Sequence, residues 1–490
     1  MAALVRTVLS ASGGTPVMSR LVSWSLDSAG VMYGARRPSG EAAGYHRETI
    51  SSRAPASATQ GSGREVSLSH TDVVPAGYGP VGSGRPGAST RIAGQYRANS
   101  QGKMGNVLPF QAAVEGFCDP GFEPLRDAFR LNFAERGELG AAVCVMVGNN
   151  VVADLYGGWA DREQGRRWQP GTLVNMFSVG KGLVAACTAR LTAQGKLDLD
   201  AAVAAYWPEF AAAGKDAITV RQLLSHQAGL PAVRRRLPPD AMLDWPAMTA
   251  ALAGQEPWWE PGTAHGYHVN TFGFLAGEVI RRVTGTTVGQ HLRTQIAGPL
   301  GADVHIGLPA AEHNRVATFI WPGPPPDEHE PPGLDSAQLM EHNSYYNPGG
   351  LSGAGVINTP RWRSAECPST NAHGTANGVA RVYAALISPA DPAIVDPAAL
   401  AEAIAEQVYG QDLVLHRPSR FGLGFQLTQP ERPIGPGQAT FGHFGAGGSL
   451  GFADPENTIA FGYVMNQMGP RWQNPRTRAL VDAVYESLAR

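Results

Sequence analysis

The chain has 490 residues, of which 43% are hydrophobic and 16% charged, and its formal net charge at pH 7 is -2. This is the composition of a globular protein of about two to four domains, and the small charge gives no indication of a nucleic acid or anionic membrane as partner. No apolar run approaches the roughly 18 residues that a membrane-spanning helix needs. The four cysteines form no Cys-x-x-Cys pair, so neither a disulfide framework nor a metal site is predicted.

Residues 1–104 differ from the remainder in composition. They are rich in Gly, Ser, Ala, Pro and Arg, and hold eleven basic residues against five acidic ones. Such a segment buries too little apolar surface to offset the entropy of ordering, so we expect disorder. The start is interrupted by Arg6 and is too short for a secretory signal, which favours a cytoplasmic protein. An organelle transit peptide, or an upstream extension of a natural chain that begins at Met104, are the alternatives.

Residues 105–490 have the pattern of a folded domain. Residues 123–136 are expected to form a helix, and the apolar runs 141–147 and 151–156 flank a Gly-Asn-Asn turn, which predicts a hairpin. Residues 320–350 are rich in Pro, Gly and Asp and are expected to form a long surface loop. Further helices are predicted at 178–195, 218–224, 271–284 with Gly285 as its stop signal, 375–386 and 399–408.

The end of the chain predicts a second hairpin, residues 448–453 and 458–465, and a last helix that begins at Asn474 and Pro475. We therefore expect an α+β fold with one antiparallel sheet, flanked by the first and last helices and carrying an inserted, mostly helical region. The α/β part is expected at about 105–200 and 375–490, and the helical part at about 200–375. One apolar face is expected on the last helix, made of Leu480, Val481, Val484, Tyr485 and Leu488.

The helix at 178–195 begins with Ser178-Val-Gly-Lys181, a Ser-x-x-Lys pattern. Residues three apart share a face of a helix, so the hydroxyl and the amine should lie side by side. A serine hydroxyl needs an adjacent base to act as a nucleophile, and a lysine serves as that base when its pKa is lowered. The alternative is a purely structural role, with Ser178 as a helix cap and Lys181 as a solvated lysine.

Two later stretches accompany this pattern: Tyr267-His-Val269, and His443-Phe-Gly-Ala-Gly-Gly448. With them, the chain resembles the serine β-lactamase and penicillin-binding-protein superfamily, and more narrowly the class C β-lactamase-like esterases called family VIII carboxylesterases. The resemblance runs from about residue 120 to the end. Its further support is Thr219-Val-Arg-Gln-Leu-Leu-Ser-His-Gln-Ala-Gly-Leu-Pro231 and the continuation of the third stretch to Pro455.

The resemblance implies a role for each matching position. Ser178 would be the acylated nucleophile, and Lys181 and Tyr267 would share the removal and return of its proton. A tyrosine beside a lysine ammonium is expected to have a lowered pKa, and the two groups to titrate as one unit. The backbone N–H groups of Ser178 and Ala446 would form the oxyanion hole. Substrate would contact His443, Phe444, Gly445 and Gly447, and neither a metal nor an organic cofactor is implied.

Departures from the penicillin-recognising pattern indicate the substrate. His443 stands where the lactamases and peptidases usually carry Lys, and a mostly neutral imidazole is a weaker anchor for a carboxylate. Val269 stands where an Asn is common, and Asn270 is one position late. Both changes favour a neutral, short-acyl carboxylic ester as the small-molecule substrate. The alternatives are β-lactamase or D-Ala-D-Ala peptidase activity, acyl transfer, and a non-catalytic binding protein.

Three further features have competing readings. Gly447-Gly-Ser449-Leu-Gly451 matches the nucleophile elbow of α/β-hydrolases, but a hairpin is expected after Ser449 where that elbow needs a helix, and no His follows it. His226 is expected to be structural. Trp258 and Trp259 fit an acyl pocket and core packing equally well.

Overall fold

The computed structural model describes residues 22–26, 32–36, 113–321, 323, 328–388 and 394–490. The chain divides into two compact units, Met1–Val74 and Pro75–Arg490. In the first unit, β1 (Val22–Leu26) and β2 (Met32–Arg36) pair as an antiparallel hairpin. The rest of residues 1–104 lies outside the described residues, so the disorder expected there stays a prediction.

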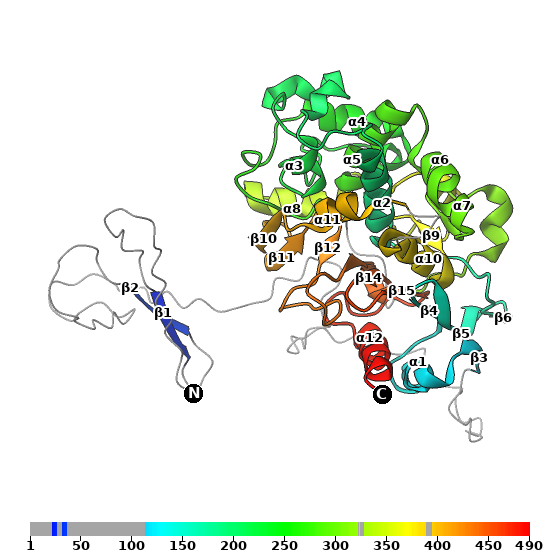
Figure 1. Ribbon diagram of the computed structural model, residues 1–490. Coiled ribbons are helices and arrows are strands. Elements are labelled where there is room, and N and C mark those ends of the chain that lie inside the picture. The colour runs from blue at the N-terminus through cyan, green and yellow to red at the C-terminus, as the bar shows by residue number, and fades with distance from the viewer. Residues whose placement is uncertain (1–21, 27–31, 37–112, 322, 324–327, 389–393) are drawn as a thin grey trace, which may run out of the picture. The chain divides into compact units, whose positions relative to one another are not determined.

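The second unit is built on one large antiparallel sheet (Figure 1). Its strand order is β10-β11-β12-β13-β14-β15-β4-β5-β3, with β6 paired to β5. The first and last predicted hairpins therefore meet at the centre of the sheet, where β15 lies beside β4. The strands are β3 (Val114–Cys118), β4 (Gly140–Val147), β5 (Asn150–Asp161), β6 (Arg166–Arg167), β10 (Val408–Gln411), β11 (Pro418–Phe421), β12 (Gln426–Leu427), β13 (Phe441–Phe444), β14 (Leu450–Asp454) and β15 (Ile459–Met465).

Helices cover both faces of this sheet, as Figure 1 shows. The first and last helices, α1 (Glu123–Glu135) and α12 (Pro475–Leu488), pack against each other, while α2 (Val179–Ala193) and α10 (Ala376–Ile387) lie on the other side. The Asn474 side chain accepts a hydrogen bond from the N–H of Arg476 and caps α12, as predicted. Leu488 is the exception on the expected apolar face, because 39% of it remains exposed.

The helical region is inserted between α2 and α10. The helix α5 (Thr271–Thr284) packs against α2, α3 and α4, and Gly285 ends it in the left-handed conformation that a glycine adopts without strain. A three-stranded sheet of β7 (Val174–Asn175), β9 (His373–Gly374) and β8 (Val304–His305) joins this region to the start of α2. The other helices are α3 (Val220–Leu224), α4 (Trp245–Gly254), α6 (Val288–Leu292), α7 (Gly298–Leu300) and α9 (Pro360–Ser364).

Two predicted elements need correction. The expected surface loop at 320–350 contains the helix α8 (Ser336–Tyr346), which Asp335 begins with a capping box and whose last turn is buried. The helix expected at 399–408 is α11 (Pro397–Ile404), because Val408 already pairs with Phe421 in the sheet. The α+β architecture itself is confirmed. Within the described ranges, no helix combines the length and apolar character of a membrane span.

Candidate active site

Ser178 is the residue from which α2 begins, at the junction between β7 and the helix. The preceding Phe177 has φ of 49°, a left-handed conformation that a bulky residue rarely adopts. Edge contacts with the rings of Phe319 and Trp321, at centroid distances of 5.1 and 6.2 Å, hold Phe177 in place. This turn leaves Ser178 at the N-terminus of α2, where the helix dipole favours negative charge.

Lys181 lies one turn into α2 and is fully buried. Its Nζ is 3.0 Å from Ser178 Oγ and donates to the carbonyl oxygens of Val269, at 2.5 Å, and Ser369, at 3.2 Å. Burial lowers the pKa of Lys181 well below its ordinary value. Lys181 Nζ therefore has three acceptors, the Ser178 hydroxyl and the two carbonyl oxygens, and loss of one proton would free a lone pair toward one of them. The geometry thus suits a base.

Tyr267 completes the predicted group of three. Its ring is stacked between Phe421 and His443, and Lys181 Nζ lies 4.8 Å from the ring centroid. Burial raises the pKa of Tyr267, and a hydrogen bond with Ser178 opposes this rise without cancelling it. The expectation of a lowered tyrosine pKa is therefore wrong, because desolvation of the phenolate outweighs any attraction to the lysine. Burial thus disfavours the charged form of both Tyr267 and Lys181.

The main chain at Tyr267 is held by Asp412, a fully buried residue that the sequence reading missed. The Tyr267 N–H donates to both oxygens of the Asp412 carboxylate, at 3.0 and 3.1 Å. The same carboxylate accepts from the N–H groups of Val414 and Leu415 and from the Ser419 hydroxyl. Asp412 thereby fixes Tyr267 to the β10–β11 hairpin. An Asp followed two residues later by a turn is the only local signal, and it does not reveal the contact with Tyr267.

His443 lies on β13 and is fully buried. Its Nδ1 donates to the carbonyl oxygen of Phe444 at 2.8 Å, which leaves Nε2, 3.5 Å from the Tyr267 hydroxyl, as the acceptor. Burial and the neighbouring Lys181 lower the pKa of His443 well below its ordinary value. The imidazole is therefore neutral, in agreement with the expectation of a weak anion anchor, and it faces the Tyr267 hydroxyl.

The loop after β13 approaches the start of α2 closely. The N–H of Gly445 donates to the Ser449 carbonyl at 2.7 Å, and Ser449 Oγ donates to the carbonyl of Met176 at 3.0 Å. A Cβ on Gly445 would lie only 2.2 Å from the Met176 carbonyl oxygen. These contacts bring Ala446 beside Ser178, and in the described part of the chain neither of their N–H groups donates to a main-chain carbonyl of another loop or turn.

Ser449 has the environment of a structural residue. It is fully buried, its hydroxyl is used by Met176, and strand β14 rather than a helix follows it. This supports the expectation that the Gly-x-Ser-x-Gly pattern is not a nucleophile elbow.

The last helix also supports the loop. The Gly447 carbonyl accepts from Asn474 Nδ2 at 2.9 Å and from Arg476 Nη2 at 3.0 Å. Arg476 Nη1 in turn binds Glu138 Oε1 at 2.9 Å, in an ion pair that is buried on both sides. Gly447 was predicted to contact substrate, and its carbonyl oxygen accepts hydrogen bonds from two residues at the start of α12.

The remaining predicted residues take structural positions. Asn270 donates to the Ser344 carbonyl and accepts from the Thr370 hydroxyl, so it does not serve as the missing amide at 269. His226 lies edge-on to the Tyr267 ring at 5.2 Å. Trp258 and Trp259 pack with α8, in a cluster whose buried members are Met340, Tyr345, Tyr346 and Val414. Across the residues that have described positions, no group of three His, Cys, Asp or Glu side chains could hold a metal ion.

Comparison with known proteins agrees with this geometry. Residues 125–486 match the family described as Beta-lactamase. The esterase/beta-lactamase LipL of Mycobacterium tuberculosis is 34% identical over 369 residues, which cover 72% of this chain and 83% of LipL. Among solved structures, a family VIII carboxylesterase is 39% identical with a TM-score of 0.71. A penicillin-binding protein homologue from Caulobacter crescentus is 41% identical with a TM-score of 0.70. Each of these two matches covers 76% of this chain and 100% of the chain in the solved structure. The chain belongs to the beta-lactamase family.

Proposed function

We propose that this protein is a carboxylesterase that cleaves short-acyl esters through an acyl intermediate on Ser178. The observation that carries the proposal is the buried Lys181 amine, whose Nζ lies 3.0 Å from the Ser178 hydroxyl and whose pKa burial lowers well below its ordinary value. The esterase names of LipL and of the family VIII structure support the same reaction class.

The chemistry follows from the resting protonation states. Lys181 takes the Ser178 proton as Oγ attacks the ester carbonyl, and the N–H groups of Ser178 and Ala446 bind the tetrahedral oxyanion. The C–O bond to the alcohol then breaks, and the departing oxygen receives the proton from Lys181, directly or through the Tyr267 hydroxyl. Water attacks the acyl-serine in the second half, with the same groups moving its proton. His443 Nε2 faces the Tyr267 hydroxyl and is placed to hold it in orientation.

The test is to label the protein with a fluorophosphonate and to map the modified peptide. The proposal predicts one adduct, on Ser178, and loss of both the adduct and p-nitrophenyl butyrate turnover in Ser178→Ala. An adduct on Ser449 would refute the assignment, and the absence of any adduct from a folded protein would favour the non-catalytic alternative.

A second candidate activity is β-lactam hydrolysis, which the double name of LipL favours. Turnover of nitrocefin and of p-nitrophenyl butyrate by the same preparation decides the order. A higher kcat/KM for nitrocefin would reverse our ordering. Addition of an alcohol acceptor to the ester assay would reveal acyl transfer as a new ester product.

A further inference from the structure

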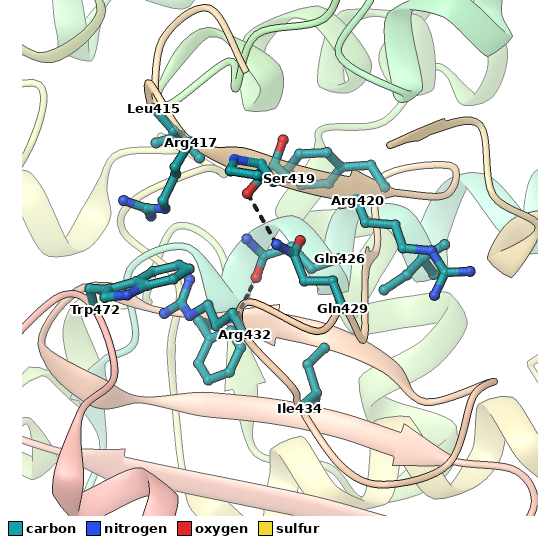
Figure 2. Close-up of a pocket in the computed structure, with 13 residues that line it drawn as sticks. Leu415, Arg417, Ser419, Arg420, Gln426, Gln429, Arg432, Ile434 and Trp472 are labelled. Atoms are coloured by element: carbon teal, nitrogen blue, oxygen red, sulfur yellow. Dashed lines mark hydrogen bonds between the residues drawn. The ribbon is translucent and has the colours of Figure 1, made fainter. Parts of the chain in front are cut away.

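A shallow hollow, open to solvent, is lined by residues of the β10–β13 part of the sheet (Figure 2). Two residues that line the hollow also adjoin the candidate active site. The Phe421 ring stacks on the Tyr267 ring, and Phe444 directly follows His443 in the sequence. What distinguishes the hollow is its charge. Arg417, Arg420 and Arg432 all line it.

Two of these arginines have no carboxylate partner. Within the described ranges, no Asp or Glu oxygen lies within 4.0 Å of a nitrogen of Arg417 or Arg432, whereas Arg420 pairs with Glu406 at 2.7 Å. The nearby carboxylate of Asp412 is occupied by its own four donors. The two guanidinium groups therefore line the hollow without a direct carboxylate partner, while the Asp412 charge still acts on Arg417 at longer range.

Aromatic rings hold these two guanidinium groups in place. Arg417 lies 4.1 Å from the centroid of the Trp472 ring, and Arg432 lies 5.1 Å from that ring and 3.7 Å from the ring of Phe444. Figure 2 shows Arg417, Trp472 and Arg432 together on one side of the hollow, with Arg420 on the other. Stacking uses the faces of the guanidinium groups and leaves N–H edges to bind an anion. One N–H of Arg432 is used, by the carbonyl of Arg471 at 3.2 Å.

Burial and the like charge of Arg417 lower the pKa of Arg432 to about 9. A guanidinium stays protonated in proteins at neutral pH, so this shift expresses the free-energy cost of an unpaired charge in a poorly solvated position. An anion in the hollow would relieve that cost for both arginines. The charge of Arg432 also acts on Tyr267 and His443, which places it within electrostatic range of the reacting groups.

We propose that Arg417 and Arg432 form a binding site for a carboxylate carried by the alcohol part of the ester substrate. The alcohol part is the one that would lie there, because its oxygen must receive a proton from Lys181 or Tyr267, and the Phe421 wall of the hollow stacks on the Tyr267 ring. The proposal rests on the proposed esterase function and refines its substrate class. His443, the residue of β13 that faces Tyr267, has a lowered pKa and supplies no positive charge for an anion, so the two arginines are the cations that would bind it.

The experiment compares two butyrate esters, 3-(butyryloxy)benzoate and its methyl ester, which differ in the negative charge and one methyl group, with release of butyrate as the measured reaction. Their kcat/KM values are divided by their rates of hydroxide hydrolysis to remove differences in reactivity. We expect a ratio of about ten in favour of the anion at low salt, as one charge-assisted contact would give. The ratio should fall as sodium chloride is added, because both arginines are only partly buried.

Variants then assign the site. Arg432→Gln and Arg417→Gln should each lower the ratio toward one, and Arg420→Gln, an arginine in the same hollow that already has a carboxylate partner, should leave it unchanged. A wild-type ratio of one or less overturns the proposal, and so does an equal loss in Arg420→Gln. The wild-type ratio and its salt dependence decide the question even where a variant does not fold. If neither ester is cleaved and Ser178 is not labelled, the esterase function itself has failed.

Discussion

Gly445→Ala tests the closeness of the two segments that would form the oxyanion hole. Gly445 has φ of -102°, which alanine adopts without strain, so the substitution acts through its added carbon alone. That carbon would lie 2.2 Å from both the Met176 carbonyl oxygen and Ser449 Oγ. Since non-bonded contacts settle at about 3.5 Å, the strand end must retreat by roughly 1.3 Å. Ala446, the next residue, moves with it.

A misplacement of about 1 Å costs on the order of 100-fold in rate, similar to the loss of one oxyanion donor. We expect kcat for p-nitrophenyl butyrate to fall by about that factor, with a loss of about 1–3 kcal/mol in the free energy of unfolding from overpacking. The matched control is Gly254→Ala, at the exposed end of α4, where an added carbon meets no atom within 4 Å. Steady-state kinetics and urea denaturation of both variants decide the matter. Wild-type kcat and stability in Gly445→Ala would refute the oxyanion role of Ala446.

Other consequences can be measured separately. Lys181→Ala and Tyr267→Phe should each lower kcat by about 100-fold or more in steady-state kinetics. The kcat of the double variant should be no lower than that of the less active single variant, because the two residues act as one unit. Because burial lowers the pKa of Lys181 and raises that of Tyr267, kcat/KM should rise with pH through the lowered lysine pKa and then stay level to about pH 9 in a pH–rate profile. Ser449→Ala should retain fluorophosphonate labelling but lose about 1–2 kcal/mol in urea denaturation, because the Met176 carbonyl loses the shorter of its two hydrogen bonds and keeps the one from the Val179 N–H. Asp412→Asn should lower stability by about 2 kcal/mol or more in thermal denaturation, since an amide nitrogen cannot accept the donors that the carboxylate binds.

Much of the fold could be predicted because its elements carry local signals. The helix α5 ends at Gly285 and α12 begins at Asn474, since a left-handed stop and a side-chain cap depend on single residues. The helix α8 shows the opposite case. Its N-terminal signal, the capping box of Asp335 and Gln338, is present in the local sequence. The Pro- and Gly-rich residues before it dominate the composition of the segment, and for this reason a loop was predicted.

The sequence predicts which residues come together in the candidate site, but it does not predict the directions of their pKa shifts. Ser178 and Lys181 meet because a helix brings residues three apart together, which the spacing alone dictates. The direction of the Tyr267 pKa depends on how much water is removed from the hydroxyl, and that is a property of the whole fold. Asp412 was missed for a related reason: its partner lies 145 positions away, and no pattern near Asp412 indicates the contact.

The buried pair of Glu138 and Arg476 joins residues 338 positions apart and, through Arg476, supports the carbonyl of Gly447. Contacts between such distant segments form late in folding. A nascent chain on the ribosome would therefore carry its serine and lysine long before it could stabilise a transition state. The support that Arg476 gives to the Gly447 carbonyl is complete only when α12 has docked.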